Sequence, residues 1–183
     1  MATVRLDGAA ETAKVEVDAN GNAGSEFKSE TLRNWVENQL DSLVQHRLPS
    51  DDHDENVTFA EDDGNHPLGR AVNLGDKAFQ SKYRIKDNMV TEVNRNAGPV
   101  RFTISVLEAQ TNDEGKYLPK VVSLSTWDNK TGELKSNTSV TNSWQRIGAF
   151  DIPLRIFEVT TRTSARQVCE LQLEQVELLK AKE

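Results

Sequence analysis

Apolar and polar residues alternate along most of this chain, from about residue 57 to its last residues, and this period of two restricts its fold more than any other feature. Such alternation is typical of strands that bury one face and expose the other. The clearest run places Val100, Phe102, Ile104 and Val106 on one side. Short turn sequences separate the runs, and strands joined by short turns pair as antiparallel neighbours. The sequence therefore predicts an antiparallel meander over about residues 56–179.

One segment near the front of the chain has a helical period instead. Its apolar residues recur at Leu32, Val36, Leu40, Leu43 and Val44. Pro49 stops the pattern, because proline cannot continue a helix. We therefore expect one main helix over about residues 29–47. Alternation over residues 4–6 and 13–17 predicts a hairpin ahead of it.

These elements together predict an α+β fold. Eight to ten antiparallel strands cannot stay flat, because their twist accumulates across the sheet. We expect a strongly curved, half-barrel-like sheet with the helix on its concave face. At 183 residues the chain is expected to form one domain, residues 1–183. The apolar fraction of 36% suits a single sheet layer with a wetted outer face.

Charge and cysteine content exclude several classes of function. The chain has 22 Lys and Arg against 29 Asp and Glu, a formal net charge of −7. Nucleic-acid binders need a clustered basic face, so we expect no nucleic-acid partner. No stretch approaches the roughly 20 apolar residues of a membrane span, so we expect a chain that is not an integral membrane protein. The single cysteine, Cys169, fits a reducing compartment and lies in an alternating run. It is interpreted as a small buried hydrophobe and not as a nucleophile.

An acidic stretch after the helix is the strongest candidate for chemistry. It consists of Asp51, Asp52, His53, Asp54 and Glu55, followed by Glu61, Asp62, Asp63 and His66. Carboxylates suit calcium or magnesium and imidazoles suit zinc, so a metal-dependent enzyme is one alternative. None of the spacings is that of a known metal loop. We therefore interpret the stretch as solvated loops, and we predict no metal, no cofactor and no catalytic residue.

Five residues are candidates for a ligand site in the hollow of the sheet. Trp127, Trp144 and Phe102 would supply an apolar wall, as small-molecule sites require. His46 and Arg47 would supply a titrating group and an anion clamp at the mouth. Both sets have a structural alternative. The aromatic residues would serve equally as core, and a cation in the last helical turn complements the helix dipole.

Several motifs resemble those of one family. In chain order they are the helix ending in His46-Arg47, Asn96-Ala97-Gly98-Pro99-Val100-Arg101-Phe102-Thr103, Gly115-Lys116-Tyr117-Leu118-Pro119, Thr126-Trp127-Asp128 with Thr131-Gly132-Glu133-Leu134, Ser143-Trp144-Gln145-Arg146-Ile147-Gly148, and Phe150-Asp151-Ile152-Pro153. The family is an uncharacterised domain of oxygenic phototrophs, found in cyanobacteria and in the plastids of plants and algae. The resemblance covers about residues 15–179. It implies a soluble protein of the chloroplast stroma, the thylakoid surface or the cyanobacterial cytoplasm.

Three functions are open at this point. The resemblance implies a non-enzymatic binding or assembly factor in the biogenesis or maintenance of the photosynthetic apparatus, acting through protein contacts. The second is a carrier of an apolar ligand, a lipid or pigment, held between helix and sheet in a way similar to the half-barrels of bacterial lipoprotein carriers. The third is the metal-dependent enzyme. A hollow filled by large apolar residues favours the first, and a dry gap lined by Trp127, Trp144 and Phe102 favours the second.

Overall fold

The computed structural model describes residues 2–5, 14–17, 29–45, 57–61, 64–75 and 79–176, with helix side chains described over 34–42. The chain divides into two compact units, Met1–His53 and Asp54–Glu183. The prediction of one domain, with the helix on the concave face of the sheet, stays a prediction. No helix in the part of the chain that the structure describes is long and apolar enough to cross a membrane.

The first unit contains a hairpin and a helix. β1 (Ala2–Arg5) and β2 (Lys14–Val17) pair as antiparallel strands, and α1 (Ser29–Gln45) contacts β2. The predicted hairpin and helix are therefore confirmed, although the last two residues of the predicted helix lie outside the described part. Within the apolar stripe of α1, Leu40 is 3% exposed. Burial of this position is what a helix with one apolar face requires.

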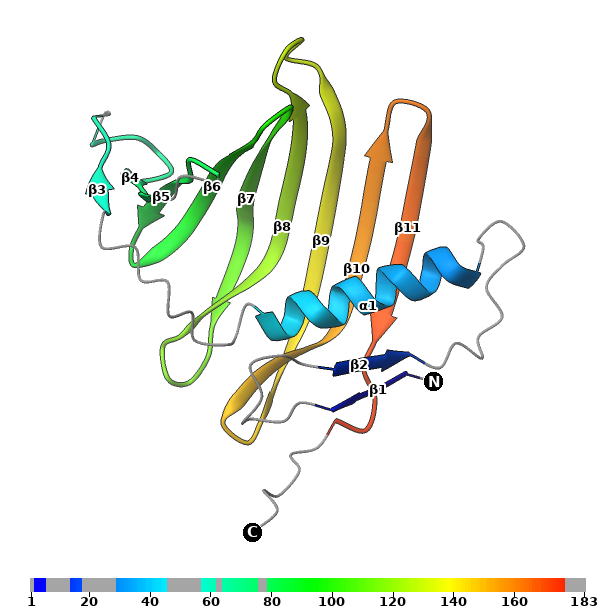
Figure 1. Ribbon diagram of the computed structural model, residues 1–183. Coiled ribbons are helices and arrows are strands. Elements are labelled where there is room, and N and C mark those ends of the chain that lie inside the picture. Colours follow the sequence, from blue (N-terminus) through cyan, green and yellow to red (C-terminus); the bar gives the residue numbers. More distant parts are fainter. Residues whose placement is uncertain are drawn as a thin grey trace. The chain divides into compact units, whose positions relative to one another are not determined.

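Nine strands of the second unit form one antiparallel sheet, in the order β11-β10-β9-β8-β7-β6-β5-β4-β3 (Figure 1). Their bounds are β3 Thr58–Phe59, β4 Arg70–Asn73, β5 Lys82–Lys86, β6 Met89–Ala97, β7 Val100–Thr111, β8 Tyr117–Asp128, β9 Leu134–Ile147, β10 Phe150–Arg162 and β11 Ala165–Gln172. Each strand pairs with the next one along the chain, which confirms the predicted meander. The sheet is open, with β3 and β11 as its edges. Its strong curvature stays a prediction.

Turns between strands follow from local chemistry. The turn at 87–88 has positive φ at both residues, a conformation that Asp and Asn tolerate. After β8, the Asp128 carboxylate accepts hydrogen bonds from the N–H groups of Lys130 and Thr131 and pairs with Lys135 at 2.7 Å. These bonds, that of Lys135 first, lower the pKa of Asp128 to about 2. The turn is thus held by a carboxylate that is ionised at neutral pH.

Some strands are shorter than their alternating runs. Phe79, Ser81, Tyr83 and Ile85 alternate and predict a strand over 79–85, but β5 begins at Lys82, because Gln80 has a φ of 46° and cannot extend the ladder. Alternation over 167–178 predicts a strand there, but β11 ends at Gln172. Gln175, with a φ of 55°, is not in an extended conformation.

From β4 to β8 the register gives the sheet one apolar and one polar face, since residues paired directly across antiparallel strands lie on the same face. One row across five strands is apolar: Val72, Tyr83, Val93, Ile104 and Leu124. The adjacent row, on the opposite face, is polar: Asn73, Lys82, Asn94, Thr103, Ser125 and Asn137. We call these the apolar face and the polar face. A two-faced single layer accounts for the low apolar content of 36%.

Candidate functional site

The sheet does not bring the three predicted aromatic ligand residues together. Phe102 pairs with Thr126, the residue before Trp127, so Phe102 lies on the apolar face and Trp127 on the polar face. Thr126 pairs in turn with Ser136 of β9, and Trp144 lies eight residues farther along that strand. At about 3.3 Å per residue this separates Trp144 from the row of Phe102 by roughly 26 Å. The prediction of one gap lined by all three is therefore wrong, and a separate role in binding for any of them stays a prediction.

Other predicted residues have separate surroundings. The guanidinium carbon of Arg101 lies 5.6 Å from the ring centre of Trp127, its partner across β7 and β8, which makes a cation–π pair. Cys169 is 8% exposed, which confirms the interpretation of a small buried residue. His46 and Arg47 lie outside the described residues.

The predicted acidic stretch also falls mostly outside the described residues, which include only Glu61 and His66 of its members. The Nδ1 atom of His66 accepts a hydrogen bond of 3.2 Å from the N–H of Leu68, so this imidazole caps a local turn. Within the described ranges, no three His, Cys, Asp or Glu side chains gather closely enough to hold a metal ion.

One end of the sheet carries a hollow of about 490 Å³ that includes Trp144. The turn between β7 and β8 and the turn between β9 and β10 form its walls. Both turns lie at the same end of the sheet, because successive turns of a meander alternate between the two ends. Most of the lining residues are polar: Gln110, Thr111, Asn112, Asp113, Glu114, Leu118, Trp144, Gln145, Arg146, Gly148 and Asp151. The Nε1 atom of Trp144 donates to the carbonyl of Pro119 at 2.9 Å. The indole is therefore anchored to its neighbouring strand.

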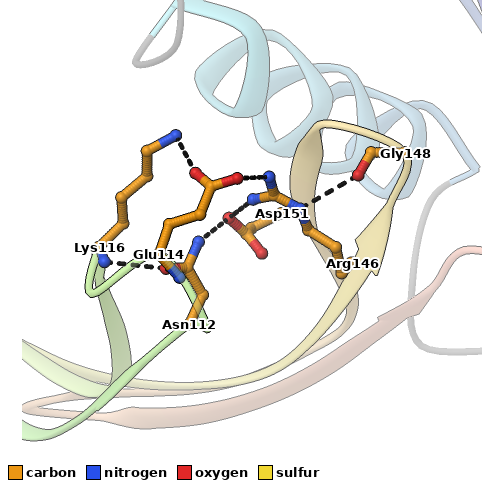
Figure 2. Close-up of polar contacts among 6 residues, drawn as sticks. All are labelled: Asn112, Glu114, Lys116, Arg146, Gly148 and Asp151. Atoms are coloured by element: carbon orange, nitrogen blue, oxygen red, sulfur yellow. Dashed lines mark hydrogen bonds and ion pairs between the residues drawn. The ribbon is translucent and has the colours of Figure 1, made fainter.

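Arg146 joins the two turns (Figure 2). Its Nη1 atom lies 2.7 Å from Oδ2 of Asp151, its Nη2 atom pairs with Oε1 of Glu114, and its Nε atom donates to the carbonyl of Gly148 at 3.1 Å. The Nδ2 atom of Asn112 donates to the same Oδ2 of Asp151 at 2.7 Å. We call Asn112, Glu114, Lys116, Arg146 and Asp151 the turn clasp.

The β7–β8 side of the clasp is shaped by Asn112. Its side-chain oxygen accepts hydrogen bonds from the N–H groups of Glu114, at 2.9 Å, and Lys116, at 2.8 Å. Asparagine commonly closes turns in this way. Gly115 has a φ of 73°, which glycine adopts without steric cost. The turn therefore presents the Glu114 carboxylate between two cations, because Lys116 Nζ lies 2.6 Å from Glu114 Oε2.

The electrostatics of the clasp suit a structural link between the two turns better than proton transfer. The hydrogen bond from Lys116 is the main cause that lowers the pKa of Glu114, and the charge of Arg146 lowers it further, while partial burial opposes both. A general acid at neutral pH needs a carboxyl pKa raised toward neutrality. Glu114 has the opposite shift, so the clasp holds two turns together as an ionised network.

No pattern in the sequence predicts the clasp, although part of its signal is visible in the chain. The run Asn112-Asp113-Glu114-Gly115 is typical of a turn, and a meander places every second turn at the same end. What the chain order does not give is the distance between Arg146 and the acids, which depends on irregularities in the register of β7 with β8 and of β9 with β10.

Replacing Arg146 by methionine is expected to lower the free energy of unfolding by about 1–2 kcal/mol, because Asp151, with a side chain only 12% exposed, loses its cation. The pKa of Glu114 is lowered in the folded state, so the ionised clasp contributes stability above the ordinary glutamate pKa. That contribution is lost as the pH falls through the lowered value. The loss of stability on acidification should therefore be smaller in Arg146→Met.

Denaturant unfolding at neutral and at acid pH measures both effects. Lys120→Met is the matched control, because it breaks an exposed ion pair of 2.6 Å with Glu108 that joins no turns. Equal unfolding curves for Arg146→Met and Lys120→Met would contradict a clasp.

Comparison with known proteins gives one finding. A family model described as "Protein of unknown function (DUF3386)" matches residues 2–179. No curated protein and no solved structure matches the chain. The match covers nearly the whole sequence, so the resemblance to an uncharacterised family is confirmed. The distribution of that family among phototrophs stays a prediction.

Proposed function

This chain belongs to the DUF3386 family of proteins of unknown function, and we propose that it is a non-enzymatic binding protein that acts through contact with another protein. The proposal keeps the setting that the resemblance implies, in plastids or the cyanobacterial cytoplasm. The partner is then a photosynthetic complex or part of its assembly machinery.

The observation that carries the proposal is a group of exposed apolar side chains at the β3 edge of the sheet. Phe59 of β3 is 64% exposed and Ile85 of β5 is 39% exposed. Arg70 of β4 links them on one face: it pairs across the strands with Ile85, and its guanidinium carbon lies 3.9 Å from the ring centre of Phe59. Val57 and Leu68 flank them in sequence with 53% and 36% exposure. We call these five residues the edge patch.

The composition of the edge patch suits a protein partner. Aromatic and arginine side chains are the residues that most often dominate the binding energy of protein interfaces. Exposed apolar side chains that gather over neighbouring strands, instead of standing singly, mark interaction sites. The arginine that stacks on Phe59 also provides hydrogen-bond donors at the rim of the same surface.

A specific observation favours the second candidate, a carrier of an apolar lipid or pigment. Tyr83, Val93, Ile104 and Leu124, in the middle of the apolar face, are half-buried, and of that row Val72 alone is buried, at 7% exposure. Central strands of a well-covered sheet bury such residues completely. The remaining apolar surface is where an acyl chain or a tetrapyrrole ring would lie, at a gain of about 25 cal/mol for each Å² removed from water.

Binding experiments with matched variants test the protein-contact proposal. Phe59→Ser should lose a partner that the unaltered chain retains from soluble extracts of plastids or cyanobacteria, because it removes the aromatic centre of the edge patch. Leu107→Ser is the control, since Leu107 is 65% exposed but lies in β7, away from that edge. Leu107→Ser should retain the partner. Retention by both variants, or loss from both with unchanged thermal melts, would overturn the assignment to the edge patch.

A ligand panel tests the carrier alternative on the same protein. Fatty acids, galactolipids and tetrapyrroles are titrated while the melting temperature and intrinsic tryptophan fluorescence are recorded. The protein-contact proposal expects no saturable response. A response that saturates at micromolar ligand would reject it in favour of the carrier.

A further inference from the structure

The two edges of the sheet differ in a way that matters for association. β3 is two residues long and offers little backbone for pairing, as protected natural edges do. β11 is eight residues long, contains no proline and, among the described strands, pairs only with β10 (Figure 1). Its outer side therefore presents a row of backbone N–H and C=O groups that pair with no strand in the described part of the chain and that another strand can bind.

The pairing with β10 determines which residues of β11 present these groups. The N–H of Leu173 donates to the carbonyl of Leu154 at 2.7 Å, in the same register that pairs Gln172 with Arg155. Backbone bonding alternates along an antiparallel pair, so every second residue counted back from Leu173 bonds to β10. The residues between them, Arg166, Val168, Glu170 and Gln172, direct their N–H and C=O groups outward.

We propose that β11 pairs with β11 of a second copy of this chain, antiparallel and centred on Val168. The two Val168 residues then face each other and exchange two backbone hydrogen bonds. On either side, Arg166 of one copy lies opposite Glu170 of the other, which places two opposite-charge pairs across the junction. The sheets of the two copies become continuous.

Charge selects this register over its neighbours. Centring the pair on Arg166 places arginine opposite arginine, and centring it on Glu170 places glutamate opposite glutamate. Like charges directly opposite each other destabilise a strand pair. Shifts in which Val168 faces a charged residue leave both charges without an opposite partner. Of these registers, only the one centred on Val168 satisfies both charges, and register is set by such side-chain matching.

The side chains that would meet are available on the polar face. Val168 is 52% exposed, which is high for a valine in a strand and leaves its surface free to pack on a second valine. Glu170 already pairs with Arg155 at 2.6 Å on its own sheet. The incoming Arg166 extends this to a row of alternating charge, Arg155, Glu170 and Arg166, across the junction.

Sedimentation velocity of the full chain over a concentration series tests the proposal. We expect a reversible dimer with a dissociation constant in the micromolar range or weaker, because one strand edge buries less surface than a standard interface. Arg166→Glu should raise that constant about tenfold or more, since it places like charges opposite each other twice. Arg166→Glu combined with Glu170→Arg restores opposite charges in the same register and should restore the dimer.

Two further variants keep the test independent of charge. Val168→Pro removes an outward N–H that has no role in the monomer, so it should abolish the dimer while the circular dichroism melt is retained. Val168→Cys should form a disulfide-linked dimer on mild oxidation, because the facing Cα atoms would lie about 5.5 Å apart, within disulfide range. Leu134→Cys, at a position 47% exposed in β9, is the control and should not cross-link this way.

Two results would overturn the proposal. One is a wild-type chain that stays monomeric up to about 1 mM, a concentration at which even a weak specific dimer is populated. The other is a dimer that survives both Val168→Pro and Arg166→Glu, which would place the interface elsewhere.

Discussion

Replacing Leu40 by aspartate is expected to lower the free energy of unfolding by about 4 kcal/mol and the melting temperature by about 10 °C. Leu40 is 3% exposed in α1, so the substitution places an unpaired carboxylate where almost no water reaches. The substitution also removes the favourable burial of the leucine side chain.

Asn38→Asp is the matched control for this prediction. It adds the same charge to the same helix at an exposed position, and it should change stability by no more than about 0.5 kcal/mol. Thermal melts of the two variants against the unaltered chain make the measurement. A melt of Leu40→Asp that overlays that of Asn38→Asp would contradict the burial of the apolar stripe.

Replacing Gly69 by alanine is expected to cost about 3 kcal/mol, for two reasons that add. Gly69 has a φ of 89°, which residues with a Cβ atom rarely adopt, and a Cβ there would lie 2.2 Å from the carbonyl oxygen of Ile85. That oxygen is backbone and cannot rotate away. Arg84, whose Nη1 atom donates to the Gly69 carbonyl at 3.0 Å, helps to hold the segment in place.

Two other glycines separate the causes. Gly98→Ala keeps a positive φ of 60° but meets nothing within 4 Å, so it should cost only the conformational part, about 1 kcal/mol. Gly64→Ala meets nothing within 4 Å at a φ outside the positive region and should be close to neutral. Denaturant unfolding of the three variants should rank Gly69, Gly98 and Gly64 in order of decreasing cost. Equal costs for Gly69→Ala and Gly98→Ala would show that the backbone at Ile85 yields.

Gly69 also bears on the proposed function, because it lies between two residues of the edge patch, Leu68 and Arg70. A substitution that shifts this segment should weaken partner binding together with stability. Phe59→Ser should weaken binding alone. Comparison of the two variants distinguishes a contact made by the patch from a contact that depends on the fold of the edge.

The sequence by itself determined the elements and their order. Period-two alternation predicts the strands of the meander, the helical stripe predicts α1, and Asp, Asn and Gly gather at 87–88 and 128–132, as turns require. These features are local, because they depend on neighbouring residues within one strand, helix or turn. For the same reason the sequence indicated that Cys169 is buried, from its place within a single alternating run.

The tertiary structure alone decided which strands' side chains share a face and which turns touch. Alternation indicates that Phe102 and Ile104 lie on the same face of the sheet, but it does not indicate whether Trp127, on the next strand, lies on that face too. That depends on the register of β7 with β8, and a shift of one residue moves every side chain of a strand to the opposite face. Irregularities near 106–109 and 126–127 contribute to that register, as do contacts between segments far apart in the sequence. The separation of Phe102 from Trp127 and the meeting of Arg146 with Glu114 and Asp151 both follow from this long-range property, which no local pattern in the chain encodes.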